Sequence, residues 1–178
     1  PSGELPPGRE AVARILEPLG YREPRRYPLD RLGMVGYVYT HVAFPETLPQ
    51  YFVSELEPER FGDEFAATVG DLVGTSRDPL PAWAREDLDR FAREESLETD
   101  RAGRLLRVLA TAFRRHHREP GLDEYELLAE VSAEMAWIAT EGHTFNHITD
   151  RVDDVVAVAE RERNRGRPVK DEVEVSGS

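Results

Sequence analysis

The sequence predicts an α+β fold in which a small sheet is interrupted by a block of about four helices. β-branched and aromatic residues dominate residues 33–44 and 50–56, as is typical of strands, whereas apolar residues between 58 and 140 recur three and four apart, as in helices. A chain of 178 residues with 39% hydrophobic content can bury one core. Strands and helices that are grouped rather than alternating favour an α+β domain.

The first element is a short amphipathic helix over residues 9–19, with the sequence REAVARILEPL. Its apolar residues recur at helical spacing: Val12, Ile15, Leu16 and Leu19. Gly20 follows as a stop signal. The next stretch, REPRRYP at 22–28, is basic and carries two prolines, and we interpret it as a turn.

Two strands of one sheet come next. GMVGYVYTHVAF at 33–44 and QYFVSEL at 50–56 have the same β-forming character, and Pro45 and Pro49 mark a turn between them. The helical block follows, and its four predicted helices are 58–73, 81–97, 99–117 and 122–142.

Three further elements are predicted behind the block: a strand at 143–149, a helix at 152–165 and a strand at 169–175. We therefore expect a single domain over 1–178, with a helix and strands at 11–56, a helical insertion at 57–142 and a strand, helix and strand at 143–178. Because proteins usually cover a strand edge such as the one at the end of this chain, we expect the chain to be a segment of a longer protein.

Charge and composition exclude several classes of function. The formal net charge of -12 would repel a phosphate backbone, so nucleic acid is not an expected partner. Of the 23 basic residues only Lys170 is a lysine, which fits either a halophilic source or a GC-rich genome. Neither a membrane span nor a signal peptide is visible, so we expect no membrane partner and a cytoplasmic location.

The absence of cysteine restricts any metal site to His, Asp, Glu or water ligands. His143 and His147 lie four apart in TEGHTFNHITD. On a strand their side chains would be roughly 13 Å apart, too far to share a metal, whereas on a helix they would come together. Gly142 and the β-forming residues after it favour a strand, so at most one of the two is a ligand, and spacing alone does not choose it. Either can also be an ordinary hydrogen-bonded histidine.

Other candidates are weaker. His116 and His117 follow a helix whose C-terminal dipole favours cations, so we interpret them as capping residues. His41 shares a strand face with aromatic residues and is either structural or part of a site. Glu55 is a single carboxylate near a strand end. No phosphate-binding loop, G-x-S-x-G or EF-hand pattern occurs.

Three stretches in a fixed order resemble the 2-oxoadipate dioxygenase/decarboxylase family. They are YFVSEL at 51–56, YELLAEVSAEMAWIATEG at 125–142 and FNHIT at 145–149. The resemblance extends over about residues 11–150, and NHIT is its most specific part. It implies a small mixed or antiparallel sheet of the vicinal-oxygen-chelate type, Fe(II) held by two His and one Glu, and cleavage of 2-oxoadipate with O2 to 2-hydroxyglutarate and CO2.

The resemblance also assigns roles to individual residues. His147 corresponds to a metal ligand, Asn146 to a residue that supports it or forms a turn, and His143 to a bystander. The family's other His, its Glu and its substrate-binding arginine fall outside residues 1–178, and His41 follows the first helix and so is not the missing His. We therefore expect one of three ligands here, no activity of this chain alone, and a pocket against the strands at 37–44 and 50–56.

Two alternatives stay open. One is a non-catalytic α+β interaction domain that retains only the fold and binds a protein partner. The other is a different vicinal-oxygen-chelate activity, such as an isomerase, which would bind a divalent metal without consuming O2. The exact substrate, the metal and the oligomeric state are not predicted.

Overall fold

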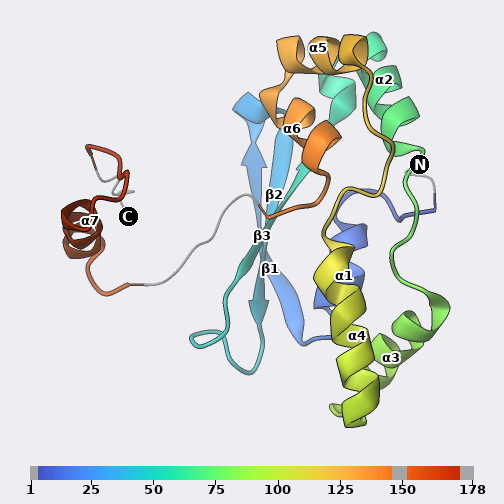
Figure 1. Ribbon diagram of the computed structural model, residues 1–178, viewed down its shortest axis with the longest axis vertical. Helices are drawn as coiled ribbons and strands as arrows, with labels where there is room; N and C mark the ends of the chain where they lie inside the picture. The colour runs from blue at the N-terminus through green and yellow to red at the C-terminus, as the bar shows by residue number, and fades with distance from the viewer. Residues whose placement is uncertain (1–3, 146–151, 173–178) are drawn as a thin grey trace. The chain divides into compact units, whose positions relative to one another are not determined.

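The computed structural model describes residues 4–145 and 152–172 (Figure 1). The chain divides into two compact units, Pro1–His147 and Ile148–Ser178. The first unit holds an antiparallel sheet and most of the helices, which confirms the predicted α+β class. In the described part of the chain, none of the helices combines the length and the apolar character that a bilayer crossing requires.

The sheet has three described strands in the order β1-β2-β3, namely β1 (Tyr21–Leu29), β2 (Met34–His41) and β3 (Tyr51–Leu56). Both neighbouring pairs are antiparallel, and the register places Tyr39 opposite Tyr51. β2 and β3 confirm the two predicted strands. Tyr37 and Tyr39, two residues apart along β2, point to the same face of the sheet and pack in one cluster with residues of α1.

The predicted turn at 22–28 is wrong, because these residues form most of β1. Their prolines are compatible with a strand here because β1 lies at the edge of the described sheet, where a missing N–H does not remove a hydrogen bond to a second neighbour. The pairing register shifts between Arg22 and Arg25, a local irregularity of the kind that proline accompanies.

Helix α1 (Glu10–Leu16) confirms the first predicted helix and packs on one face of the sheet. Buried residues from both elements form one apolar cluster: Val12, Ala13, Leu16, Tyr21, Val35, Tyr37 and Tyr39. Gly20 has a φ of 90°, which lets the chain turn directly from this helix into β1.

Five α-helices follow β3 in place of about four. After the short 3-10 turn Pro58–Phe61 they are α2 (Asp63–Val73), α3 (Ala82–Glu94), α4 (Thr99–Ala112), α5 (Leu122–Val131) and α6 (Ala133–Glu141). The extra helix arises at Ser132, which has extended backbone angles and splits the predicted helix at 122–142. The Ser132 hydroxyl accepts a hydrogen bond from Met135 N at 3.2 Å and so caps α6.

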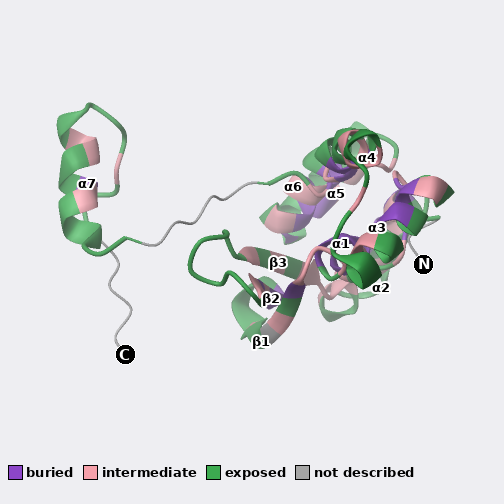
Figure 2. Ribbon diagram, turned by 90° about the horizontal axis from the view of Figure 1, so that it is seen from below, coloured by how far each residue is buried: buried purple, intermediate pink, exposed green. Residues whose placement is uncertain are grey.

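Two further apolar clusters hold the helices. One joins Ile15 of α1 to buried leucines and alanines of α3 and α4, and the other joins α2, α5 and α6. Figure 2 shows that buried residues are concentrated in this first unit and that α7 (Val155–Asn164) in the second unit is exposed along most of its length.

The elements predicted behind the helical block are only partly found. α7 confirms the predicted helix at 152–165. Residues 143–145 do not form the start of a strand, because Gly142 ends α6 with a φ of 67° and the Thr144 hydroxyl donates to the Glu141 carbonyl at 2.7 Å. Residues 169–172 are not a strand either. The remainder of both predicted strands, 146–149 and 173–175, lies outside the described residues.

Candidate functional site

A cleft of about 510 Å³ opens in the first unit between β3, the end of α4 and the residues that follow α6. Its lining residues are Tyr51, Leu109, Ala110, Phe113, Arg114, Thr144 and Phe145. The volume is in the range of small-molecule sites, and such sites are mostly apolar with a few polar groups. The cleft borders β3 as the sequence predicted, whereas none of residues 37–44 lines it.

Aromatic rings form one wall of the cleft. The Phe145 ring centroid lies 4.9 Å from that of Phe113 and 5.9 Å from that of Tyr51. Tyr51 in turn packs edge-on against Tyr21 at 5.1 Å. Burial, together with the nearby Tyr51, raises the pKa of Tyr21, so the Tyr21 hydroxyl stays protonated at neutral pH. The wall therefore offers apolar surface and tyrosine hydroxyl groups.

Arg114 is the cleft's charged residue. It follows α4 by two positions, and its side chain makes no ion pair or hydrogen bond with the rest of the described chain. Its neighbour Arg115, by contrast, binds Glu119 at 2.7 Å. Among the residues that the structure describes, no Asp or Glu lines the cleft, and Arg114 is the charged group of that lining. Such a surface is suited to an anion.

Three histidines gather next to the cleft, where the end of α4 meets the end of α6. His116 Nε2 lies 3.0 Å from the Ala112 carbonyl, the last residue of α4, and His117 Nε2 lies 3.0 Å from the Ala139 carbonyl of α6. The His116 contact satisfies a carbonyl at the end of α4, as the predicted capping role requires, whereas His117 contacts the last turn of α6 rather than its own helix.

His143 is the third member of this histidine group. Burial lowers its pKa to about 4, and the charges of His116, His117 and Arg14 act in the same direction. Burial also lowers the pKa of His117. His143 is therefore neutral at physiological pH.

His41 and Glu55 have structural partners. His41 Nδ1 accepts a hydrogen bond from Phe44 N at 3.0 Å, and its ring stacks on Phe44 with a centroid distance of 5.3 Å. Glu55 Oε1 accepts a hydrogen bond from Arg9 N at 3.4 Å. Burial raises the pKa of Tyr37, and the adjacent Glu55 carboxylate adds to that effect. These contacts join the sheet to α1 and to the end of β2.

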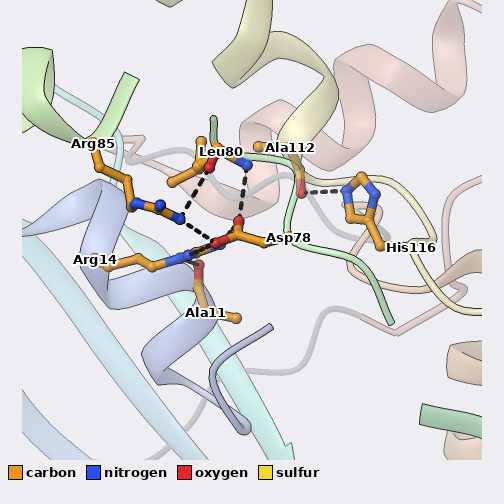
Figure 3. A network of polar contacts seen from close by, with 7 residues as sticks. All are labelled: Ala11, Arg14, Asp78, Leu80, Arg85, Ala112 and His116. Atoms are coloured by element: carbon orange, nitrogen blue, oxygen red, sulfur yellow. Dashed lines mark hydrogen bonds and ion pairs between the residues drawn. The ribbon is translucent and has the colours of Figure 1, made fainter. Parts of the chain in front are cut away.

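A polar network connects α1 to the loop before α3 (Figure 3). Asp78 binds Arg14 through two hydrogen bonds and Arg85 at 2.8 Å, and it accepts a hydrogen bond from Leu80 N. Arg14 also contacts the Ala11 carbonyl of its own helix at 3.4 Å. The network fixes α1 against the loop before α3 and against α3 itself.

The described residues do not supply a metal centre by themselves. Within 4–145 and 152–172, no three His, Asp or Glu side chains gather closely enough to hold a metal ion. The predicted ligand His147 and its neighbour Asn146 lie outside the described residues, so both assignments stay predictions. Arg114 and Phe113 were not singled out from the sequence, where FRRHH reads only as the end of a helix.

Comparisons with known proteins relate the chain to one family. The model of the 2-oxoadipate dioxygenase/decarboxylase family matches residues 3–178. A protein from Ralstonia eutropha JMP134, assigned to the glyoxalase superfamily, is 50% identical with a TM-score of 0.93, and the match covers 99% of this chain and 55% of that one. No curated protein matches.

Two crystal structures from Pseudomonas putida share the fold at lower identity. The hydroxyglutarate synthase is 19% identical with a TM-score of 0.75, and the match covers 92% of this chain and 40% of that one. The same enzyme in complex with 2-oxoadipate is 19% identical with a TM-score of 0.74, covering 92% and 38%. The chain thus spans about half or less of the length of these solved structures.

Proposed function

This chain belongs to the 2-oxoadipate dioxygenase/decarboxylase family, and from that premise we propose that it acts in the oxidative decarboxylation of a 2-oxo dicarboxylic acid such as 2-oxoadipate. The observation that carries the proposal is the family match over residues 3–178, which covers the sheet, the helical block and the cleft. The complex of the Pseudomonas putida enzyme with 2-oxoadipate supports the choice of substrate class.

The proposed reaction takes 2-oxoadipate and O2 to 2-hydroxyglutarate and CO2. The bond between the carboxylate carbon and the ketone carbon breaks, the carboxylate leaves as CO2, and both oxygen atoms of O2 are accounted for in the two products. No additional reductant is needed, because the 2-oxo acid supplies the electrons. The small-molecule partners are therefore a 2-oxo acid and O2.

We propose Fe(II) as the metal and His147 as one of its ligands. Bound Fe(II) would provide coordination positions at which a 2-oxo acid and O2 can meet. The described residues do not complete a ligand set, so we derive no step through the metal. His143 is left out of the proposed ligand set because the resemblance to the family assigns the metal-binding position to His147.

The described residues have a supporting role in this proposal. The aromatic wall of Tyr51, Phe113 and Phe145 excludes water from one side of the cleft, which protects reactive species from hydrolysis or quenching. Phe145 precedes the proposed ligand His147 by two residues in the sequence. Its ring contacts thus anchor the chain close to that ligand.

The test is anaerobic Fe(II) binding by calorimetry on the protein as its gene encodes it, with and without 2-oxoadipate. We expect stoichiometric binding that His147→Ala abolishes and that His143→Gln, the matched control, leaves intact. Equal binding by the wild type and His147→Ala would contradict the ligand assignment. Metal binding without O2 consumption would favour an isomerase-type activity instead, and binding of no metal would favour an interaction domain.

A further inference from the structure

We propose that Arg114 binds the carboxylate of the substrate that lies farther from the 2-oxo group, with the apolar body of the acid placed against Tyr51 and Phe145. This inference rests on the proposed function for the identity of the acid. The shape, lining and charge of the cleft support the binding site itself.

The shape and lining point to a small organic molecule. The cleft measures about 510 Å³ and is bounded by Leu109, Phe113 and Phe145 on its apolar sides. Small-molecule sites typically measure about 300 to 1,000 Å³ and combine apolar walls with a few polar groups. The methylene groups of an aliphatic acid would replace water on these walls, and burial of that apolar surface favours binding.

The charge of the cleft selects an anion over a cation or a neutral ligand. Arg114 has no partner within 4–145 and 152–172, and no carboxylate from those residues lines the cleft to neutralise it. The planar guanidinium matches the two oxygens of a carboxylate and can donate two parallel hydrogen bonds to it. Most of the protein is acidic, with a formal net charge of -12, so a cationic cleft is a local exception.

A second group can assist recognition. The Tyr51 hydroxyl belongs to a lining residue and makes no hydrogen bond within the described residues. The Thr144 hydroxyl, in contrast, is already donated to the Glu141 carbonyl at 2.7 Å. Tyr51 therefore remains able to donate to an oxygen of the bound acid.

The location connects the cleft to the proposed chemistry. A 2-oxo dicarboxylic acid has one carboxylate beside its ketone, which the reaction removes, and a second carboxylate at the other end, which stays in the product. The second carboxylate needs a cationic partner of its own. Arg114 and Phe145 both line the cleft, and Phe145 is two residues from the proposed ligand His147 in the sequence.

The test measures dissociation constants by NMR titration of the metal-free protein as its gene encodes it. The ligands are 2-oxoadipate, adipate, which lacks the oxo group, and 1,6-hexanediol, which lacks the charges. The variants are Arg114→Gln, Arg114→Lys and Ala110→Trp, which fills the cleft. Arg107→Gln is the matched control, because Arg107 is an exposed arginine of α4 that does not line the cleft.

We expect wild type and Arg107→Gln to bind both acids but not the diol. Arg114→Gln should weaken binding of both acids by about tenfold or more, because two charge-assisted hydrogen bonds are lost, and Arg114→Lys should recover part of the loss. Ala110→Trp should weaken binding of both acids as well. The proposal is overturned if Arg114→Gln binds adipate as well as Arg107→Gln does, or if wild type binds neither acid.

The experiments distinguish a wrong assignment of the carboxylate site from a wrong proposed function. If Arg114→Gln loses adipate binding while the protein consumes no O2 with 2-oxoadipate, the carboxylate site stands and the dioxygenase proposal is wrong. If Arg114→Gln turns over 2-oxoadipate with an unchanged KM, the dioxygenase proposal stands and the carboxylate site is wrong.

Discussion

Asp78 receives two hydrogen bonds from the guanidinium of Arg14, one on each carboxylate oxygen and each 2.7 Å long, across 64 residues of sequence. The two side chains are 13% and 20% exposed, so water screens the pair only partly. Arg85 and the N–H of Leu80 complete the coordination of the carboxylate. The pair thus connects α1, which packs on the sheet, to the loop that precedes α3.

Replacing Asp78 should destabilise the fold. Burial acts to raise the pKa of Asp78, but the hydrogen bonds from Arg14 and Leu80 outweigh it and lower the pKa, so the carboxylate is charged when folded. Asp78→Asn leaves Arg14 without its counter-charge and should cost about 1 to 3 kcal/mol in the free energy of unfolding. Urea denaturation measures this loss. Asp89→Asn, an exposed change on α3, is the control, and an equal effect of the two variants would contradict the prediction.

The histidine group should make the protein less stable in mild acid. The pKa of His143 is lowered by burial from 6.5 to about 4, so below pH 6.5 the unfolded chain binds a proton that the folded chain does not. Stability is therefore complete above pH 6.5 and falls as the pH decreases toward 4, by up to about 3 kcal/mol. His117 contributes in the same direction because burial lowers its pKa too.

The matched variant for this pH dependence is His143→Gln, which keeps a polar side chain of similar size but does not titrate. We expect the slope of unfolding free energy against pH between 4 and 6.5 to be shallower in His143→Gln than in wild type. Identical slopes measured by urea denaturation would show that His143 does not carry the effect.

Gly142 should not tolerate a side chain. Its φ is 67°, and a Cβ at this position would lie 2.4 Å from the Cα of Arg115. Gly142→Ala therefore combines backbone strain with a clash against main chain, and we expect a loss of more than about 2 kcal/mol. Gly62→Ala separates the two causes, because Gly62 also has a positive φ, 102°, but nothing lies within 4 Å of the added carbon. Thermal unfolding measures the stability of both variants. An equal loss of stability in Gly142→Ala and Gly62→Ala would mean that the clash with Arg115 is relieved.

The hydroxyl of Ser132 should be needed to start α6. Ser132 is 5% exposed and accepts a hydrogen bond from Met135 N, so Ser132→Ala leaves a buried N–H without a partner. We expect a loss of about 1 kcal/mol, the usual cost of removing an N-cap. Ser54→Ala, an exposed change on β3, should have little effect. Chemical denaturation measures the free energy of unfolding of both variants. An equally large loss in Ser54→Ala and Ser132→Ala would contradict the capping role of Ser132.

Hydrophobic periodicity predicted β2, β3 and the positions of most helices, because an element with one buried face has apolar residues at regular spacing. The prediction was wrong where single residues determine the local backbone. The prolines at 24 and 28 indicated a turn, but they are compatible with an edge strand. Ser132 lies within an unbroken apolar pattern, and only its extended backbone and its cap reveal that two helices meet there.

The candidate site was less predictable than the fold, since its residues come from distant parts of the chain. Tyr51, Phe113 and Phe145 are separated by tens of residues and meet only because β3, α4 and the end of α6 converge. Arg114 gives no signal in sequence, because an arginine at a helix end is expected for reasons of charge alone. His147 was assigned by the resemblance and lies outside the described residues, so its role is a matter for experiment.

The central claim is that the protein takes part in oxidative decarboxylation of a 2-oxo dicarboxylic acid. The most direct measurement is the stoichiometry of O2 consumed, CO2 released and 2-hydroxyglutarate formed when the protein as its gene encodes it is supplied with Fe(II) and 2-oxoadipate. The account predicts equal amounts of the three and none of them in His147→Ala. Consumption of 2-oxoadipate without O2 uptake, or no reaction in the wild type, would contradict it.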